Sequence, residues 1–277
     1  MIHKNEPIDP YFEKLIVKIK DLSGLDFSQY RLSCLKRRID SRLRFNNLKT
    51  YKEYIFFLEQ NPCELSALLN YLTINLTEFY RDIEAWDIIT NEVAPSIIAQ
   101  KLKEKRLRIN IWSAGTSSGE EAYTLAMIFL EALTKQEMQF SLMIYGTDID
   151  EASLERAKAG RYPAKNLDFL PKPLLNRYFN QDNEHYIASP LLKEVTIFKW
   201  HDLISSKPLK AMDLIVCRNV LIYFNRTLQS TIFEMFYKSL LKNGFLMLGK
   251  TESLLSNVAN QFEIYHSRER IYKKVPD

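Results

Sequence analysis

The sequence is poor in cysteine and contains no long apolar run, and each absence excludes a class of protein. Its three cysteines, Cys34, Cys63 and Cys217, are odd in number and far apart, so they predict neither a disulfide framework nor a CxxC metal site. No apolar run approaches the roughly 18 residues that a membrane-spanning helix needs. The first ten residues, MIHKNEPIDP, lack the apolar core of a secretory signal. We therefore expect a protein of the reducing cytoplasm, without direct membrane insertion and without a bound metal.

Glycine and histidine are also scarce. Of only seven glycines, Gly115 and Gly119 enclose the stretch GTSSG, directly after a predicted strand. This stretch fits the G-x-S-x-G turn that presents a nucleophilic serine in hydrolases, here Ser117. It fits equally a glycine loop that lets the N-terminus of a helix approach a bound cofactor. A hydrolase would need a histidine base, and the three histidines that follow the loop lie in settings that do not favour this role.

The apolar pattern divides the chain into two parts. From residue 11 to about residue 71, apolar residues recur at three- and four-residue steps, which predicts three or four helices. After about residue 106, short apolar runs alternate with amphipathic helical segments, which is typical of a mostly parallel sheet with helices on both faces. We therefore expect a small all-helical domain, residues 1–75, followed by an α/β domain, residues 76–277.

Individual elements of the second part can also be placed. The predicted strands cover residues 107–114, 140–147, 194–200, 212–219 and 244–250. The predicted helices cover residues 120–133, 149–159 and 226–241. The tail QFEIYHSRERIYKKV predicts a terminal antiparallel hairpin.

The residues around the glycine loop favour the cofactor interpretation. Glu120 and Glu121 fall in the first turn of the following helix, where acids suit the helix dipole but would repel a phosphate. The second predicted strand ends in Asp148, where an open α/β sheet places the acid that binds a ribose diol. A ligand that combines ribose with positive charge fits S-adenosylmethionine.

Six stretches of the chain resemble the chemotaxis receptor methyltransferases of the CheR type. They are LTINLTEFYRD (72–82), IWSAGTSSGEEAYTLAM (111–127), YGTDID (145–150), FKWHDL (198–203), MDLIVCRNVLIYF (212–224) and GFLMLGKTESL (244–254). Members of this bacterial family transfer a methyl group from S-adenosylmethionine to glutamate side chains of chemoreceptors, giving methyl esters and S-adenosylhomocysteine in sensory adaptation. The resemblance implies a Rossmann-like class I methyltransferase domain whose seven-stranded sheet ends in the antiparallel hairpin.

The resemblance also implies roles for individual residues. Arg81 would orient the incoming carboxylate, and Tyr223 would help to position the methyl donor. Glu121, or alternatively Glu120, would bind the ammonium group of the cofactor, and Asp148 would bind its ribose hydroxyls. The other residues expected to contact the cofactor are Asn75, Thr77, Arg81, Gly115, Asp202, Leu203, Arg218 and Asn219.

Positive charge is concentrated in one segment of the helical part. Residues 31–49 hold seven Lys or Arg against one Asp, a local net charge of +6, while the whole chain carries +4 at pH 7. In the family the N-terminal domain helps to dock the receptor's methylation region, so a helix bearing Arg37, Arg38, Arg42 and Arg44 would be attracted to that acidic surface. A solvated basic face or a nucleic-acid contact is the alternative, and we expect no nucleic-acid partner.

Some relatives insert a small β-subdomain that binds a pentapeptide at the receptor's C-terminus and contains a glycine-rich turn. If such a β-subdomain forms in this chain, we expect it at about residues 176–195. These residues contain no glycine, so we expect an enzyme that is independent of the pentapeptide. A catalytically inactive cofactor-binding module and a serine hydrolase that uses Ser117 are the alternative functions.

Overall fold

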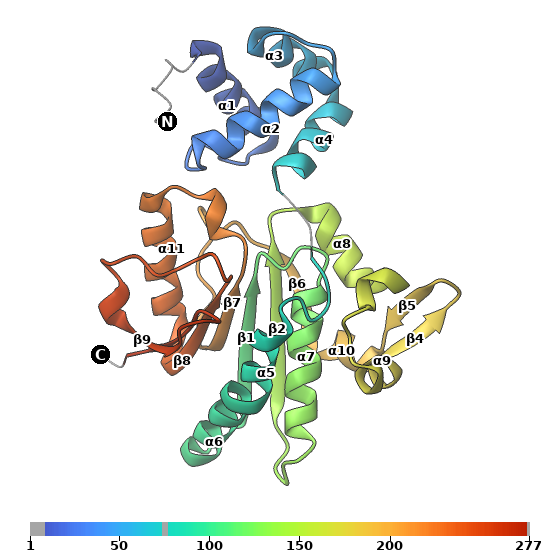
Figure 1. The fold of residues 1–277 in the computed structure, drawn as a ribbon, viewed down its shortest axis with the longest axis vertical. Coiled ribbons are helices and arrows are strands. Elements are labelled where there is room, and N and C mark those ends of the chain that lie inside the picture. Colours follow the sequence, from blue (N-terminus) through green and yellow to red (C-terminus); the bar gives the residue numbers. More distant parts are fainter. Residues whose placement is uncertain (1–8, 74–76, 276–277) are drawn as a thin grey trace. The chain divides into compact units, whose positions relative to one another are not determined.

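The computed structural model describes residues 9–73 and 77–275, which belong to two compact units (Figure 1). The helical unit comprises Met1–Ile74 and Tyr223–Leu228. The sheet unit comprises Asn75–Ile222 and Gln229–Asp277. Each unit has its own hydrophobic core.

Four helices form the part of the helical unit that the structure describes between residues 9 and 73. They are α1 (Pro10–Ser23), α2 (Leu32–Phe45), α3 (Tyr51–Gln60) and α4 (Pro62–Leu72). The side chain of Asp9 caps the start of α1, and Gly24, in the left-handed conformation at φ +75°, ends it. Thr50 and Glu53 form a capping box at the start of α3. Apolar residues at helical spacing on these four helices form the core of the unit.

A seven-stranded sheet forms the centre of the sheet unit. Its strand order is β6-β2-β1-β7-β8-β10-β9, in which the first five strands run parallel, β10 runs antiparallel to β8, and β9 runs antiparallel to β10. The strands are β1 (Arg108–Ala114), β2 (Ser141–Asp148), β6 (Thr196–Trp200), β7 (Met212–Cys217), β8 (Leu240–Leu248), β9 (Phe262–His266) and β10 (Ile271–Lys274). The predicted fold class, a mostly parallel sheet that ends in an antiparallel hairpin, is confirmed.

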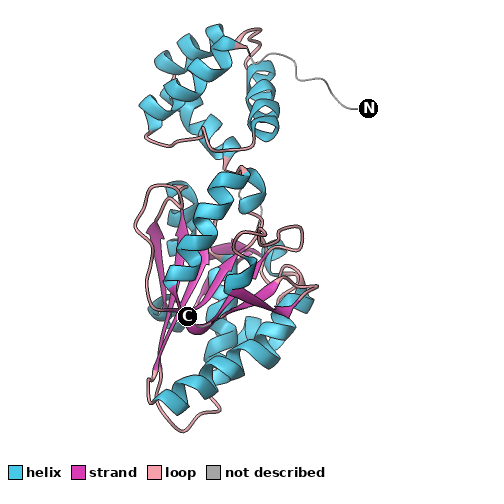
Figure 2. Cartoon of the chain, turned by 90° about the vertical axis from the view of Figure 1, so that its left-hand side faces the viewer, coloured by secondary structure: helices cyan, strands magenta, loops and turns pink. Residues whose placement is uncertain are grey.

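Helices pack on both faces of this sheet (Figure 2). They are α5 (Ile83–Ile88), a π-helical turn η1 (Ile89–Val93), α6 (Ala94–Glu104), α7 (Glu120–Leu133), α8 (Glu151–Ala159), α10 (Pro190–Val195) and α11 (Arg226–Ser239). Successive strand residues point to opposite faces: Ile111 joins the core beneath α7, whereas Trp112 packs edge-on against Phe236 of α11. Because both faces are covered, every residue of β7 is buried.

A small antiparallel sheet is inserted between α8 and α10. Its order is β3-β5-β4, with β3 (Arg161–Pro163), β4 (Phe179–Asp182) and β5 (His185–Ala188), and the short helices η2 (Ala164–Leu167) and α9 (Lys172–Tyr178) precede β4. Figure 1 shows it set off from the larger sheet, beyond α9 and α10. The sheet recruits β3 from outside the predicted range 176–195. Asn183, at φ +53°, takes the left-handed position in the β4–β5 turn, so this turn forms without glycine.

Several predicted boundaries were wrong. The strand predicted for residues 212–219 ends at Cys217, and the strand predicted for residues 244–250 covers Leu240–Leu248. The strand predicted for residues 194–200 starts at Thr196, because Pro190 and the capping side chain of Ser189 begin the helix α10. The helix predicted for residues 149–159 starts at Glu151, because Asp150 caps it. The helix predicted for residues 226–241 ends at Ser239 and continues directly into β8. A short apolar run is compatible with helix and strand alike, so the pattern alone did not place this last boundary.

Candidate functional site

The loops that carry the predicted cofactor residues gather at one edge of the large sheet. They follow the carboxyl ends of β1, β2, β6 and β7. The chain order reverses between β1 and β7, since β2 and β6 lie on one side of β1 and the later strands on the other. In open α/β sheets ligands bind in the crevice outside such a reversal. The topology therefore places the candidate site at this carboxyl edge.

The glycine loop is shaped by close packing within the protein. Gly115 and Gly119 have φ of +80° and +96°, and Gly119 is the N-cap of α7. A Cβ on Gly115 would lie 2.4 Å from Cγ2 of Val220, and one on Gly119 would lie 2.8 Å from Cβ of Ala157. We expected these glycines to give clearance to a cofactor. The structure adds a different reason, because the protein's own side chains already fill the space that a Cβ would take.

Asp148 joins the loops that follow β1 and β2. Its Oδ2 accepts a hydrogen bond from Ser117 N at 2.8 Å, and its Oδ1 accepts one from Asp150 N at 3.0 Å. Burial raises the pKa of Asp148, and these backbone N–H groups oppose the shift. A carboxylate offers about four acceptor positions, so each oxygen keeps capacity for a ligand hydroxyl.

The two acids at the start of α7 lie in different environments. Glu120 is fully buried and accepts hydrogen bonds from Ser118 Oγ at 2.8 Å and from Asn166 Nδ2 at 3.0 Å. Asn166 belongs to η2, within the insert that carries the small sheet between α8 and α10, so Glu120 binds this insert. Burial raises the pKa of Glu120 to about 7. Neighbouring helical residues point about 100° apart, so Glu121 faces elsewhere. Its Oε1 accepts from Ser113 Oγ at 2.8 Å, at the end of β1.

Glu121 also lies within a field of positive charge. Its Oε2 is 3.9 Å from Nη1 of Arg218. Burial raises the pKa of Glu121, whereas the charges of Arg218 and Arg81 lower it. Glu121 is therefore the acid of the pair that lies at the carboxyl edge with basic groups nearby.

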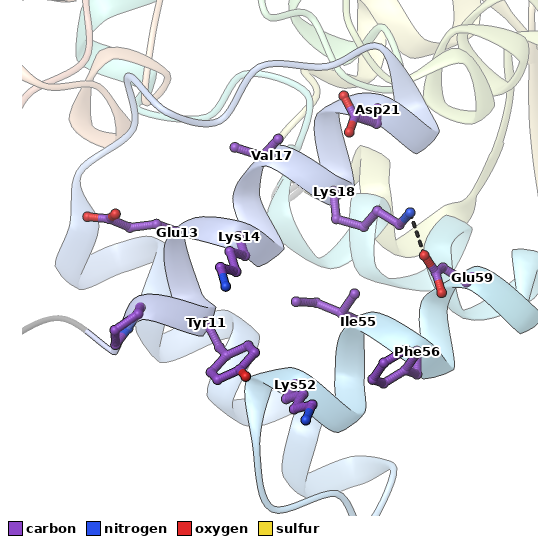
Figure 3. A pocket seen from close by; sticks show the side chains of 11 residues that line it. Tyr11, Glu13, Lys14, Val17, Lys18, Asp21, Lys52, Ile55, Phe56 and Glu59 are labelled. Carbon is purple, nitrogen blue, oxygen red and sulfur yellow. Dashed lines mark ion pairs between the residues drawn. The ribbon is translucent and has the colours of Figure 1, made fainter.

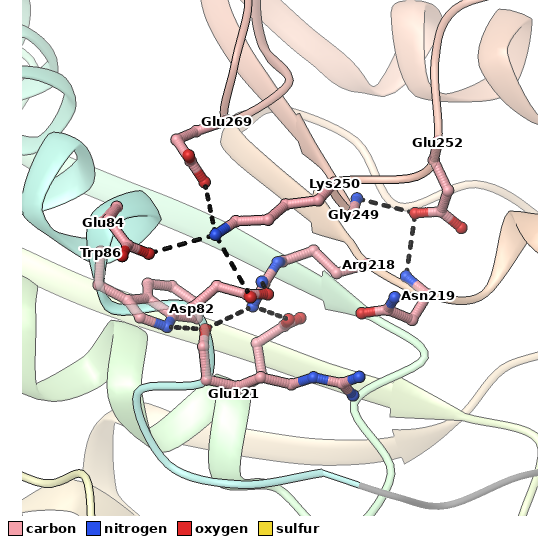
Figure 4. Close-up of polar contacts among 11 residues, drawn as sticks. Asp82, Glu84, Trp86, Glu121, Arg218, Asn219, Gly249, Lys250, Glu252 and Glu269 are labelled. Carbon is pink, nitrogen blue, oxygen red and sulfur yellow. Dashed lines mark hydrogen bonds and ion pairs between the residues drawn. The ribbon is translucent and has the colours of Figure 1, made fainter.

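Arg218 holds the turn that presents Arg81 (Figure 4). Arg218 Nη1 donates to the carbonyl oxygen of Arg81 at 3.2 Å, its Nη2 pairs with Asp82, and its guanidinium lies 5.3 Å from the ring centroid of Trp86. The indole Nε1 of Trp86 donates to the same carbonyl oxygen at 2.8 Å. Tyr80 and Asp82, on either side of Arg81, have φ of +56° and +62°. The backbone of Arg81 is thus clamped while its side chain stays exposed.

Lys250 extends this network outward from the end of β8. Its Nζ lies 3.2 Å from Glu84, 3.5 Å from Asp82 and 3.7 Å from Glu269. These partners come from the start of α5, the turn before it and the β9–β10 turn. Asp82, Trp86 and Lys250 were not predicted as site residues, although Asp82 lies within the motif LTINLTEFYRD and Lys250 within GFLMLGKTESL.

The other predicted cofactor residues differ in their burial and in their hydrogen-bond partners. Asp202 follows β6, and its carboxylate accepts from Ile204 N at 2.9 Å and from Ser205 Oγ at 2.6 Å, so it already orders its own turn. Leu203 and Thr77 are half-buried. Asn219 follows β7 with φ +61°.

Two predicted residues do not belong to the described part of the sheet unit. Asn75 lies outside the described residues. Tyr223 belongs to the helical unit, where the guanidinium of Arg38 lies 4.8 Å from its ring centroid and its carbonyl oxygen accepts from Arg31 N at 2.7 Å.

The four arginines predicted to dock a receptor divide into two pairs. Arg38 is buried and donates to the carbonyl oxygen of Leu72 at 2.5 Å, and Arg42 pairs with the buried carboxylate of Glu64. Arg37 and Arg44 are exposed. Charge counting along the sequence missed this division, because two of the charges hold the helical unit together.

The helical unit also carries a groove between α1 and α3 (Figure 3). Its volume is about 620 Å³, and its lining includes Tyr11, Val17, Phe56 and the ion pair of Lys18 with Glu59. None of the residues predicted from the sequence to act in catalysis or binding lines it.

Within residues 9–73 and 77–275, no group of three or more His, Cys, Asp or Glu is arranged to hold a metal ion. None of the helices in these ranges combines the length and apolar character needed to cross a bilayer.

Comparison with known proteins agrees with this arrangement of elements. The domain described as "CheR methyltransferase, all-alpha domain" matches residues 10–73, and "CheR methyltransferase, SAM binding domain" matches residues 75–271. Chemotaxis protein methyltransferases from Borreliella burgdorferi and Listeria monocytogenes are 33% and 32% identical to this chain. These alignments cover 88% and 89% of this chain, and 88% and 90% of the relatives.

A third relative is much longer. An uncharacterized 104.1 kDa protein of Rhodobacter capsulatus is 32% identical over 93% of this chain, but this chain spans only 27% of its length. The two family domains together cover nearly all of the chain, in the order in which the two units occur. The chain belongs to the CheR methyltransferase family and is an S-adenosylmethionine-dependent methyltransferase.

Proposed function

We propose that this enzyme methylates glutamate side chains of chemoreceptors in sensory adaptation, giving glutamate methyl esters and S-adenosylhomocysteine. The observation that supports it most is that a largely buried acid, Glu121, whose side chain is 12% exposed, and an exposed arginine, Arg81, occur at the same edge of the sheet, where the charge of Arg81 lowers the pKa of Glu121. The first suits the ammonium group of a cofactor and the second suits an incoming carboxylate. The names of the relatives from Borreliella and Listeria point to the same pathway.

The residues at the carboxyl edge fit S-adenosylmethionine. In this proposal Glu121 binds the ammonium, Asp148 binds the ribose hydroxyls, and Asp202 and Leu203 flank the adenine. The acceptor capacity left on Asp148 and the hydroxyl donor that already orients Glu121 support these roles. Thr77, Gly115 and Asn219 complete the site, and Asn75 and Glu120 remain predictions from the resemblance. Arg218 acts chiefly by holding Arg81 and by balancing the charge of Glu121.

Methyl transfer to a carboxylate does not require a general acid or a general base. Bound S-adenosylmethionine supplies an electrophilic methyl group. A glutamate side chain, with an ordinary pKa of about 4.3, is already ionised at neutral pH. The protein therefore has to orient this carboxylate and strip water from it. Arg81 orients it, aided by a clamped backbone, and Tyr223 helps to align the methyl donor.

The exposed arginines of α2 suit the approach of an acidic receptor surface. Arg37 and Arg44 are available for this contact, whereas Arg38 and Arg42 have partners inside the helical unit. Such surface charges chiefly speed the encounter of the partners. The helical domain, residues 1–75, is thus the docking domain, and residues 76–277 form the methyltransferase domain. We also propose that docking does not need a receptor pentapeptide, and binding of a receptor tail peptide at micromolar concentration would refute this.

The decisive experiment incubates the enzyme with radiolabelled S-adenosylmethionine and the cytoplasmic region of a receptor. Carboxyl methyl esters release methanol in base, so base-labile volatile label is the expected product. Arg81→Ala is expected to lower kcat by about 10- to 100-fold, the effect of losing a charge-assisted hydrogen bond worth about 1.4–2.7 kcal/mol. Arg106→Ala, at an exposed arginine in the turn before β1, is the matched control. Label that is stable in base, or equal rates for both variants, would refute the proposal.

A second experiment tests docking. Reversing the charges in Arg37→Glu/Arg44→Glu is expected to lower kcat/KM for the receptor and to flatten its dependence on salt, because fewer charges steer the encounter. Arg106→Glu is the control for a charge reversal away from α2. A reduction of the same size in the control would contradict docking by α2.

A further inference from the structure

Glu252 is a buried acid at the carboxyl edge that none of the predicted roles includes. It lies four residues after the end of β8 and is 5% exposed. Its Oε2 accepts from Gly249 N at 2.8 Å and from Asn219 N at 2.9 Å (Figure 4). Its Oε1 accepts from Ile222 N at 3.2 Å. One carboxylate therefore joins the chain after β8 to the chain after β7.

The partners of this carboxylate are all of one kind. Among the described residues, its hydrogen-bond donors are backbone N–H groups. Burial raises the pKa of Glu252, and the N–H groups of Gly249, Asn219 and Ile222 oppose the shift. A buried charge is unfavourable unless it is well compensated, and an uncharged side chain in this place would avoid that cost. The acid is thus suited to gather three N–H groups that would otherwise lack acceptors.

The segment that Glu252 holds begins in the left-handed backbone conformation. Asn219 has φ +61°, a region that asparagine tolerates better than other non-glycine residues but that is still less favourable than the right-handed one. Gly249 makes the contact possible, since a Cβ there would lie 2.8 Å from Oε2 of Glu252 and 2.9 Å from Asn219 N. A residue with a Cβ at position 249 would therefore push apart the segment after β8 and the segment after β7.

The same segment forms one wall of the glycine loop. Val220, next to Asn219, occupies the space beside Gly115 that a Cβ would fill. Fixing Asn219 and Ile222 therefore also fixes Val220 against the loop that follows β1. Contact runs without a gap from Glu252, through this segment, to the loop at the start of α7.

We propose that Glu252 is a positioning residue for cofactor binding: it holds the segment Asn219–Ile222 so that Asn219 and the glycine loop are preformed for S-adenosylmethionine. This rests on the proposed placement of the cofactor at the carboxyl edge. A site that is already ordered loses less entropy on binding, so loosening the segment weakens the cofactor complex. Glu252 does not itself touch the reacting atoms in this role.

The test compares Glu252→Gln with Asp213→Asn. Asp213 is a buried carboxylate at the opposite end of β7, where it pairs with Lys101 at 2.7 Å and accepts from Asn110 N at 3.0 Å. Glutamine keeps the size of Glu252 but turns an N–H₂ group toward one of the backbone donors. Binding of S-adenosylhomocysteine is measured by calorimetry, and thermal unfolding is measured on the same samples.

Glu252→Gln is expected to weaken S-adenosylhomocysteine at least about tenfold, which equals about 1.4 kcal/mol. Asp213→Asn is expected to lower the melting temperature at least as much but to leave affinity within about twofold, because the amino edge of the sheet is remote from the site. Glu252→Asp, which keeps the charge on a shorter side chain, is expected to fall between wild type and Glu252→Gln. It supplies the affinity measurement if the glutamine variant does not fold.

Kinetics separate positioning from a general loss of structure. Glu252→Gln is expected to raise KM for S-adenosylmethionine about tenfold while kcat at saturating cofactor stays within about threefold. Unchanged affinity in both Glu252 variants, or equal losses of affinity in Glu252→Gln and Asp213→Asn, would overturn the proposal. If the wild-type enzyme binds S-adenosylhomocysteine but does not methylate receptors, the proposed substrate fails, and the affinities still decide the role of Glu252.

Discussion

Replacing Glu120 by glutamine should change how stability depends on pH. Glu120 is fully buried, and burial raises its pKa from an ordinary 4.5 to about 7. The folded state therefore binds this proton more tightly than the unfolded state does. The stabilisation is fully present below pH 4.5 and is lost as the pH rises through about 7. A pKa difference of about 2.5 corresponds to about 3 kcal/mol of unfolding free energy.

The assay is urea denaturation of wild type and Glu120→Gln at intervals between pH 4.5 and pH 8. Other groups titrate alike in both proteins, so the difference between their free energies of unfolding isolates Glu120. Relative to the variant, wild type should lose about 3 kcal/mol across this range. Glu155→Gln, at an exposed acid paired with Lys158, is the control and should give a flat difference. A flat difference for Glu120→Gln as well would refute the reasoning.

Glutamine variants of Glu120 and of Glu121 test which of the two acids binds the cofactor. Glu120 accepts a hydrogen bond from Asn166 of the inserted segment, whereas the carboxylate of Glu121 bonds to Ser113 of β1 and lies near Arg218. Glu120→Gln should therefore keep its affinity for S-adenosylhomocysteine within about twofold, whereas Glu121→Gln should lose about tenfold through the missing charge. The reverse order of affinities would assign the ammonium to Glu120.

Two further substitutions test the glycine loop and the clamp on Arg81. Gly115→Ala should lower the free energy of unfolding by about 2–4 kcal/mol, through the clash with Val220 and the positive φ, and Val220→Ala should restore part of this loss in urea denaturation. Trp86→Phe removes the N–H donor to the carbonyl oxygen of Arg81 and should slow methyl transfer about fivefold with cofactor affinity unchanged. An unchanged rate would separate the clamp from catalysis.

Much of the fold could be read from the sequence, because its signals are local. The helix predicted at residues 120–133 matches α7, since Gly119 precedes it and apolar residues fill its length. The alternation of apolar runs with helices predicted the parallel sheet. Boundaries failed where an apolar run continued across the junction between α11 and β8, where periodicity does not distinguish helix from strand. The small sheet was predicted too narrowly, because β3 pairs with β5 across more than twenty residues of chain.

For the candidate site, too, local signals could be predicted from the sequence and long-range contacts could not. The sequence by itself determined the family, the fold class and the kinds of side chain available, because motifs and periodicity are written along the chain. Only the tertiary structure decided what each side chain touches. In the folded protein Glu120 bonds to Asn166 of the inserted segment and Glu121 bonds to Ser113 at the carboxyl edge of the sheet. Adjacent helical residues point in different directions, so the two acids have different neighbours. Folding also brings Arg38 to the carbonyl oxygen of Leu72 and Glu252 to the backbone N–H of Asn219. Each pair is more than thirty positions apart in the sequence, so its members meet only when the chain folds.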